Sequence, residues 1–138
     1  MARATFGLDY GSGGIAMKAA GLVAADTAET AVFLGRGWFA VRITWTACEI
    51  ATGDELYNVE FQANTAAVTG TWFELGNMAF GASVTPLGGA VATAATGEQW
   101  LAFFNPYDNQ VRVNTWVAGT IATGFNFSVD AYPLTHLA

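Results

Sequence analysis

The chain has little of the chemistry on which enzymes and metal sites depend. Its 138 residues include one cysteine, Cys48, and one histidine, His136. An internal disulfide is therefore excluded, and a zinc site lacks ligands. The histidine lies close to the chain end, where residues are usually mobile, so it is a poor candidate for a catalytic base. The sequence predicts no catalytic residue, no metal ligand and no cofactor.

Basic residues are also scarce. Five lysines and arginines face eleven acidic residues, which gives a formal net charge of −6. Nucleic-acid binding requires clustered basic side chains that displace counterions from phosphates, and here they are scattered. The same scarcity disfavours an anionic membrane surface. We therefore expect neither nucleic acid nor membrane as a direct partner.

The carboxylates give no clear sign of a hydrolase. They are expected to be solvated surface groups, with Asp54 and Glu55 in a turn. A calcium site that uses Asp54, Glu55 or Asp108 stays open, because Ca²⁺ tolerates irregular cages of oxygen ligands. The other carboxylates considered as a catalytic pair are Glu49, Glu60, Glu74 and Glu98.

Aromatic and β-branched residues, by contrast, are abundant and alternate. Hydrophobic residues make up 53% of the chain, and the run WFAVRITW at 38–45 alternates with period two. Similar alternation follows at 55–63, 98–104, 110–118 and 125–131. This pattern predicts an all-β protein, an antiparallel β-sandwich or jelly roll of about seven or eight strands. The aromatic residues assigned to its inner faces are Phe39, Trp45, Phe61, Phe73, Phe103, Phe125 and Phe127.

The N-terminal residues differ in composition from the rest. Residues 1–30 are rich in glycine and alanine and poor in β-branched residues, so we expect a flexible arm, followed by a β-sandwich domain at 31–138. Phe6, Leu8 and Tyr10 are spaced at period two within that arm. They are expected to add a strand to the sheet edge of a neighbouring subunit.

Three tryptophans occupy positions opposite the expected core faces. Trp72, Trp100 and Trp116, with the outward Arg112, form a candidate surface for an interface or a ligand. Such rings stack on sugars, bury against a neighbouring subunit, or pack under a second sheet or a long loop. The sequence leaves these three alternatives open.

The order of elements resembles the small jelly-roll decoration, or cement, proteins on tailed-phage heads. Three features carry this resemblance: the polar alternation LYNVEFQ at 56–62, a Gly/Ala/Thr-rich connection at 81–97, and a closing hairpin at 104–120. In that family, a hairpin that combines an aromatic residue, Arg-Val and Gly-Thr ends the domain, and an arm precedes it.

The resemblance implies a virion protein on the capsid exterior, made in the host cytoplasm. Its partners would be the major capsid protein and copies of itself, as homotrimers at lattice junctions. The long glycine-rich arm and the high tryptophan content depart from the family pattern. They leave open a carbohydrate- or receptor-binding module of a tail or head fibre as the alternative function. A small jelly-roll hydrolase is the weakest hypothesis.

Overall fold

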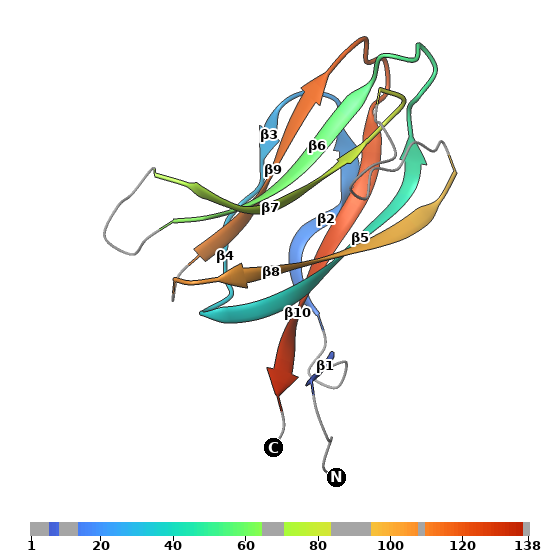
Figure 1. The fold of residues 1–138 in the computed structure, drawn as a ribbon. Coiled ribbons are helices and arrows are strands. Elements are labelled where there is room, and N and C mark those ends of the chain that lie inside the picture. Colours follow the sequence, from blue (N-terminus) through green and yellow to red (C-terminus); the bar gives the residue numbers. More distant parts are fainter. Residues whose placement is uncertain (1–5, 9–13, 65–70, 84–94, 108–109, 137–138) are drawn as a thin grey trace.

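Two antiparallel sheets packed face to face form the described part of the protein (Figure 1). The computed structural model describes residues 6–8, 14–64, 71–83, 95–107 and 110–136. Within them there is no helix. The strands are β1 (Phe6–Leu8), β2 (Ile15–Val23), β3 (Thr27–Ala28), β4 (Val32–Phe33), β5 (Gly37–Cys48), β6 (Leu56–Ala63), β7 (Phe73–Phe80), β8 (Gly97–Asn105), β9 (Gln110–Ala118) and β10 (Phe125–His136).

The strand order is that of a jelly roll. In the first sheet, β10 lies between β5 and the pair formed by β1 and β2, and β8 is the edge strand beyond β5. In the second sheet, β3 and β4 both pair with β9, which is followed by β6 and the edge strand β7. When β1 is counted with β2 and β3 with β4, eight strands are divided equally between the two sheets, the jelly-roll arrangement. The predicted fold class is confirmed.

The core consists of the residues that alternation placed on the inner faces. Phe39, Trp45, Phe61, Phe103, Phe125 and Phe127 are all buried, as predicted. Phe125 belongs to a cluster of contacting rings, and its ring centroid is 4.5 Å from that of Phe127 and 4.9 Å from that of Phe80. Rings of this kind bury large apolar areas and dominate the energy of a small core.

One predicted core residue, Phe73, is 44% exposed. It begins β7, an edge strand, and among the described residues the ring of Tyr107 lies against it, at 6.1 Å between centroids. The alternation assigned the correct inward side to Phe73, opposite the buried Ala63 in register. It did not reveal that the facing sheet covers little of this position.

The predicted boundary between arm and domain at residue 30 is wrong. Strand β2 pairs with β10 over Ile15–Val23, and β3 pairs with β9. Met17 and Val23 of β2 are buried in the core. The segment was predicted as an arm because small residues weaken the strand signal. Its pairing with the long central strand β10 overrides that weak local preference.

Strand β2 also contains an irregularity that a buried lysine stabilises. The register with β10 shifts beside Phe127, and the Lys18 ammonium donates to the carbonyl oxygens of Ala19, Gly21 and Phe127 at 2.9 to 3.1 Å. Burial lowers the pKa of Lys18, while the charge of Glu29 acts in the opposite direction. The side chain thus supplies a charged donor to three carbonyl groups beside the irregularity.

Of the predicted arm residues, Phe6 and Leu8 belong to β1. This short strand pairs with Leu134–His136 at the end of β10 in the same chain, beyond the last residue that β10 shares with β5 (Figure 1). Tyr10 lies outside the described residues. The structure therefore gives the first strand of the predicted arm a partner within its own subunit.

Candidate interaction surfaces

Carboxylates hold the loops at one end of the sandwich through hydrogen bonds. Glu49 follows β5, and its carboxylate accepts the backbone N–H groups of Ala122, Thr123 and Gly124 at 2.9 to 3.1 Å. These donors, that of Thr123 foremost, lower the pKa of Glu49. A residue considered as a catalytic carboxylate thus binds the turn between β9 and β10.

The turn between β5 and β6 uses two further carboxylates. Asp54 accepts the Thr52 hydroxyl at 2.6 Å and the backbone N–H and hydroxyl of Thr120 at 3.0 and 2.9 Å, and these bonds, those of Thr52 first, lower its pKa. Glu55 was expected to be solvated, but it is fully buried. Burial raises the pKa of Glu55, and hydrogen bonds from Thr52 and Gly53 outweigh that effect, so its pKa lies below the ordinary value.

Acid is expected to destabilise the protein through these three carboxyl groups. Their pKa values are lower in the folded than in the unfolded chain, so their contribution is complete above the unfolded values, about 4. It is lost as the pH falls through the folded values. The melting temperature, measured by calorimetry, should stay level from pH 7 to about 5 and fall steadily below that range.

Glu49→Gln provides the test of this assignment. At pH 7 the variant should melt below the parent protein, and the two curves should converge as the pH drops. Glu74→Gln changes an exposed carboxylate on β7 that accepts only from the exposed Asn77 side chain among the described residues, and it should run parallel to the parent curve. A Glu49→Gln curve parallel to the parent would show that the carboxylate does not fasten this turn.

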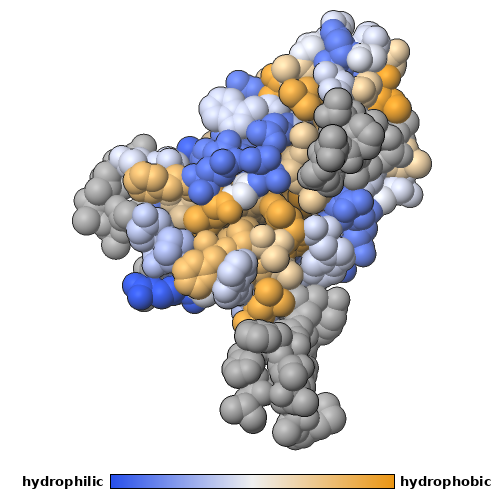
Figure 2. All heavy atoms as spheres, in the orientation of Figure 1, coloured by the Kyte–Doolittle hydropathy of each residue, from blue (hydrophilic) through white to orange (hydrophobic). Residues whose placement is uncertain are grey.

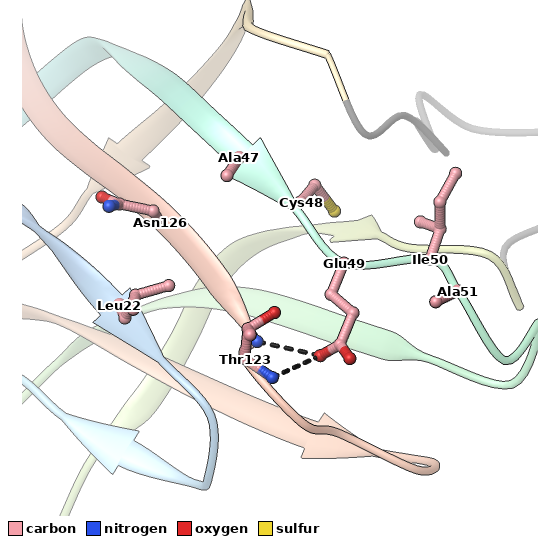
Figure 3. A pocket seen from close by; sticks show the side chains of 9 residues that line it. Leu22, Ala47, Cys48, Glu49, Ile50, Ala51, Thr123 and Asn126 are labelled. Carbon is pink, nitrogen blue, oxygen red and sulfur yellow. Dashed lines mark hydrogen bonds between the residues drawn. The ribbon is translucent and has the colours of Figure 1, made fainter.

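A hollow of about 580 Å³ opens next to Glu49 (Figure 3). Its lining comes from the ends of β2 and β5, the start of β10 and the chain after Cys48. Figure 3 shows the Glu49 carboxylate directed at the backbone beside Thr123, so the charged group of the lining is already engaged. Cys48 is buried, as expected for an inert thiol. The hollow offers apolar contact rather than reactive groups.

The outer face of the first sheet has a different character. Trp38 on β5 lies opposite Phe104 on β8, and their ring centroids are 5.4 Å apart. Both side chains are largely exposed, at 54% and 41%. The next outward pair in register, Ala40 and Ala102, has only methyl groups. On the other side of Ala40, Tyr132 of β10 lies opposite it in register, and the Tyr132 ring centroid is 5.6 Å from that of Trp100, so aromatic side chains continue across the sheet. Figure 2 views the side of the molecule on which β7 and β8, the edge strands of the two sheets, lie, and apolar residues gather along them there as well.

Arg42 extends this surface towards β10. Its guanidinium carbon lies 5.8 Å from the centre of the Trp100 ring and 5.6 Å from that of Tyr132. Its Nη2 is 3.4 Å from the Asp130 carboxylate, and Nε is buried without a hydrogen-bond partner among the described residues. We call the set Trp38, Arg42, Trp100, Phe104 and Tyr132 the aromatic face.

The outer face of the second sheet carries a chain of polar contacts between two tryptophans. Arg112 Nε donates to Gln62 Oε1 at 2.8 Å, and Gln62 Nε2 donates to Glu60 Oε1 at 2.9 Å. The indole N–H of Trp116 donates to the other oxygen of Glu60 at 2.6 Å. At the opposite end, the Arg112 guanidinium lies 4.1 Å above the Trp72 ring. We call these five residues the tryptophan ladder.

The four outward residues predicted as one surface are divided between two. Trp72, Arg112 and Trp116 belong to the tryptophan ladder, whereas Trp100 lies on the other sheet, in the aromatic face. Trp116 is exposed, and Trp72 and Trp100 are half-buried. The period of two placed each ring outward, but which strands share a sheet depends on pairing, which alternation leaves undetermined.

Sequence reasoning missed the two most exposed members of the aromatic face. Trp38 and Phe104 were not singled out, although each adjoins a correctly predicted core phenylalanine, Phe39 or Phe103. The signal was present, because a residue next to an inward one in a strand points outward. Their proximity follows only from the pairing of β5 with β8.

The fold and the surfaces described above are the observations from which a function can be argued. No protein-family model, curated protein or solved structure matches the chain. The described residues contain no helix of the length and apolarity needed to cross a membrane. No group of three or more His, Cys, Asp or Glu side chains in the described ranges is placed to hold a metal ion.

Proposed function

We propose that this chain is a structural virion protein that decorates and stabilises the capsid of a tailed phage. Its partners are the major capsid protein and further copies of itself, as a homotrimer on the capsid exterior. The resemblance in the closing hairpin and in the 56–62 strand supports this function, and so does the jelly-roll strand order. The observation that carries it is the aromatic face.

The aromatic face has the composition of a protein interface. Trp, Tyr and Arg are the residues enriched among those that contribute most to binding energy. Here they are grouped on one sheet, with Trp38 and Phe104 largely exposed to solvent and Arg42 and Trp100 partly exposed, while Tyr132 is buried. Exposed rings that adjoin one another on a small domain usually mark a surface that another protein covers.

The edge strand β8, which carries Phe104, has few of the features that protect edge strands from pairing with another chain. Natural edge strands are protected by lysine, proline, a bulge or short length. The nine residues of β8 include neither lysine nor proline, and the register with β5 has no shift. Next to the exposed rings, Ala102 of β8 is also exposed and adds apolar surface that a protein partner such as a capsid shell can cover.

Loss of the two exposed rings is expected to abolish attachment. In the double variant Trp38→Ser, Phe104→Ser, occupancy on capsids should fall at least tenfold, because the apolar centre of the interface is removed. Capsids from a phage that lacks the gene for this chain supply bare shells, and bound protein is measured after sedimentation. Phe33→Ser is the matched control, since Phe33 is 63% exposed but lies on β4 in the other sheet.

The outcomes are distinct. Full occupancy of the double variant would show that the aromatic face is not the attachment surface. Failure of the unaltered chain to bind bare capsids would overturn the proposed function itself. Light scattering on the purified chain tests the homotrimer, for which a mass of three chains is expected and a stable monomer would speak against it.

The same occupancy assay tests whether the arm is needed for binding. The structure determines how many N-terminal residues can be removed without damage to the domain. Removal of residues 1–25 would take away β2 and its buried Met17 and Val23, so the domain itself would suffer. Removal of residues 1–13 keeps β2 intact, and reduced occupancy of that variant is expected if the arm links neighbouring subunits.

A further inference from the structure

The tryptophan ladder is built differently from the aromatic face. Its two rings are separated by side chains with hydrogen-bonding groups, whereas the rings of the aromatic face adjoin one another. Gln62 at its centre is only 7% exposed, and it both accepts from Arg112 and donates to Glu60. The polar groups are therefore held in place by each other before any ligand arrives.

An aromatic ring beside fixed donors and acceptors matches the chemistry of a sugar. A pyranose ring presents C–H groups on its faces and hydroxyl groups around its rim. The apolar face stacks on an indole, and the hydroxyls require directed polar partners. Trp116 is 47% exposed, and the Nη groups of Arg112 are further donors beside Trp72. Because the ladder is ordered in advance, binding has less conformational entropy to lose.

The length of the ladder indicates an oligosaccharide rather than a single sugar. Arg112, which lies above the ring of Trp72, is four residues from Trp116 on β9. At the usual rise per residue of a strand, this separation is about 13 Å. A contact with the Trp116 ring and a contact with the Arg112–Trp72 pair, that far apart, require a ligand longer than one sugar unit.

The charge of the face indicates a neutral ligand. Glu60 is part of the ladder, and Glu74 lies opposite Gln62 in the register of β6 and β7. Arg112 offsets one of these two carboxylates, and the whole chain carries a formal net charge of −6. An acidic polysaccharide would be repelled by this field.

We propose that the tryptophan ladder of Trp72, Arg112, Gln62, Glu60 and Trp116 is a binding face for a neutral oligosaccharide. This activity is independent of the proposed attachment through the aromatic face, because the two surfaces lie on the outer sides of different sheets. A decorating protein built in this way attaches through one side and presents a glycan-binding surface on the other.

The first test is a printed array of neutral and acidic glycans, probed with the labelled full-length chain. Neutral oligosaccharides are expected to bind. Trp116→Ala and Trp72→Ala should each lose at least tenfold in affinity, with their melting temperatures checked against the parent protein. Phe33→Ala, an equally drastic truncation of an exposed ring outside the ladder, should bind normally.

The second test locates the site by the indole N–H signals in a nitrogen-15 NMR spectrum. Titration with a neutral hexasaccharide that binds on the array should shift the signals of Trp72 and Trp116, assigned from their alanine variants. The signals of Trp38, Trp45 and Trp100 should stay in place.

Three results would overturn the proposal. One is that no neutral glycan on the array binds above the level of the Trp72→Ala, Trp116→Ala double variant. Another is that the glycan shifts the signals of Trp38 or Trp100 instead. The third is that the double variant binds glycan normally but loses capsid occupancy, which would make the ladder a protein interface. The first two results do not bear on whether the aromatic face attaches to the capsid. The third would make the ladder a capsid contact, and the occupancy of the Trp38→Ser, Phe104→Ser variant then shows whether the aromatic face is needed as well.

Discussion

Phe125→Ala is expected to destabilise the protein by about 3 to 5 kcal/mol, close to the whole stability of many small domains. Phe125 is fully buried, and its ring meets those of Trp45, Tyr57, Phe80 and Phe127 at centroid distances of 4.5 to 6.3 Å. Removal of the ring loses its transfer free energy and leaves a cavity that four rigid neighbours cannot fill. Urea unfolding followed by fluorescence measures the loss.

Phe73→Ala is the matched control, because it removes the same ring from a site that is 44% exposed. Its expected cost is below about 1 kcal/mol, since one neighbouring ring, that of Tyr107, is found against it. Phe125→Leu keeps part of the packing and allows measurement if the alanine variant is too unstable to purify. Equal losses at positions 125 and 73 would show that the aromatic cluster is not the centre of the core.

The contrast between these two phenylalanines shows how far the sequence predicts the fold. Period-two alternation identifies the side of a strand that faces inward, and it did so for Phe125 and for Phe73 alike. The degree of burial depends on where a strand lies within the sheet. Phe125 begins the central strand β10, whereas Phe73 begins the edge strand β7, and that difference arises from long-range pairing.

The failure at β2 has a related cause. Its sequence IAMKAAGLV contains few β-branched residues, so local preference gives little sign of a strand. The strand forms because β10 offers it a partner edge, and because the Lys18 ammonium can serve the carbonyl groups at its irregularity. Neither condition is visible in a single sequence.

The candidate surfaces show the same limit. The outward direction of Trp72, Trp100 and Trp116 was predictable, but their distribution over two sheets was not. That distribution changes the functional argument, because it separates a cluster of adjoining rings from a ladder with polar groups between its rings. One surface formed by all three tryptophans would favour either a protein or a sugar as the partner. Two separate surfaces allow the aromatic face to bind a protein and the tryptophan ladder to bind a sugar.

Gly119→Ala is expected to lower stability by about 2 kcal/mol or more, the second-largest effect predicted for this chain. The residue directly follows β9 and has a φ of +92°, a conformation that L-residues rarely adopt. A methyl group at this position would also collide with the backbone carbonyl of Asp54. Relief would require the two turns that Asp54 and Thr120 hold together to move apart. Urea unfolding gives the magnitude.

Gly53→Ala separates the two causes. Gly53 has a φ of +87°, so alanine meets the same backbone penalty there, but no atom lies within 4 Å of the added methyl group. Its expected loss is about 1 kcal/mol, and the excess at Gly119 measures the contact between the turns. The difference in stability loss between Gly119→Ala and Gly53→Ala should be smaller in a Glu49→Gln background. Glu49 binds the turn between β9 and β10 through three N–H groups, so without its carboxylate this turn moves more easily to accommodate the methyl group. Equal losses at the two glycines would mean that the turns are not packed against each other.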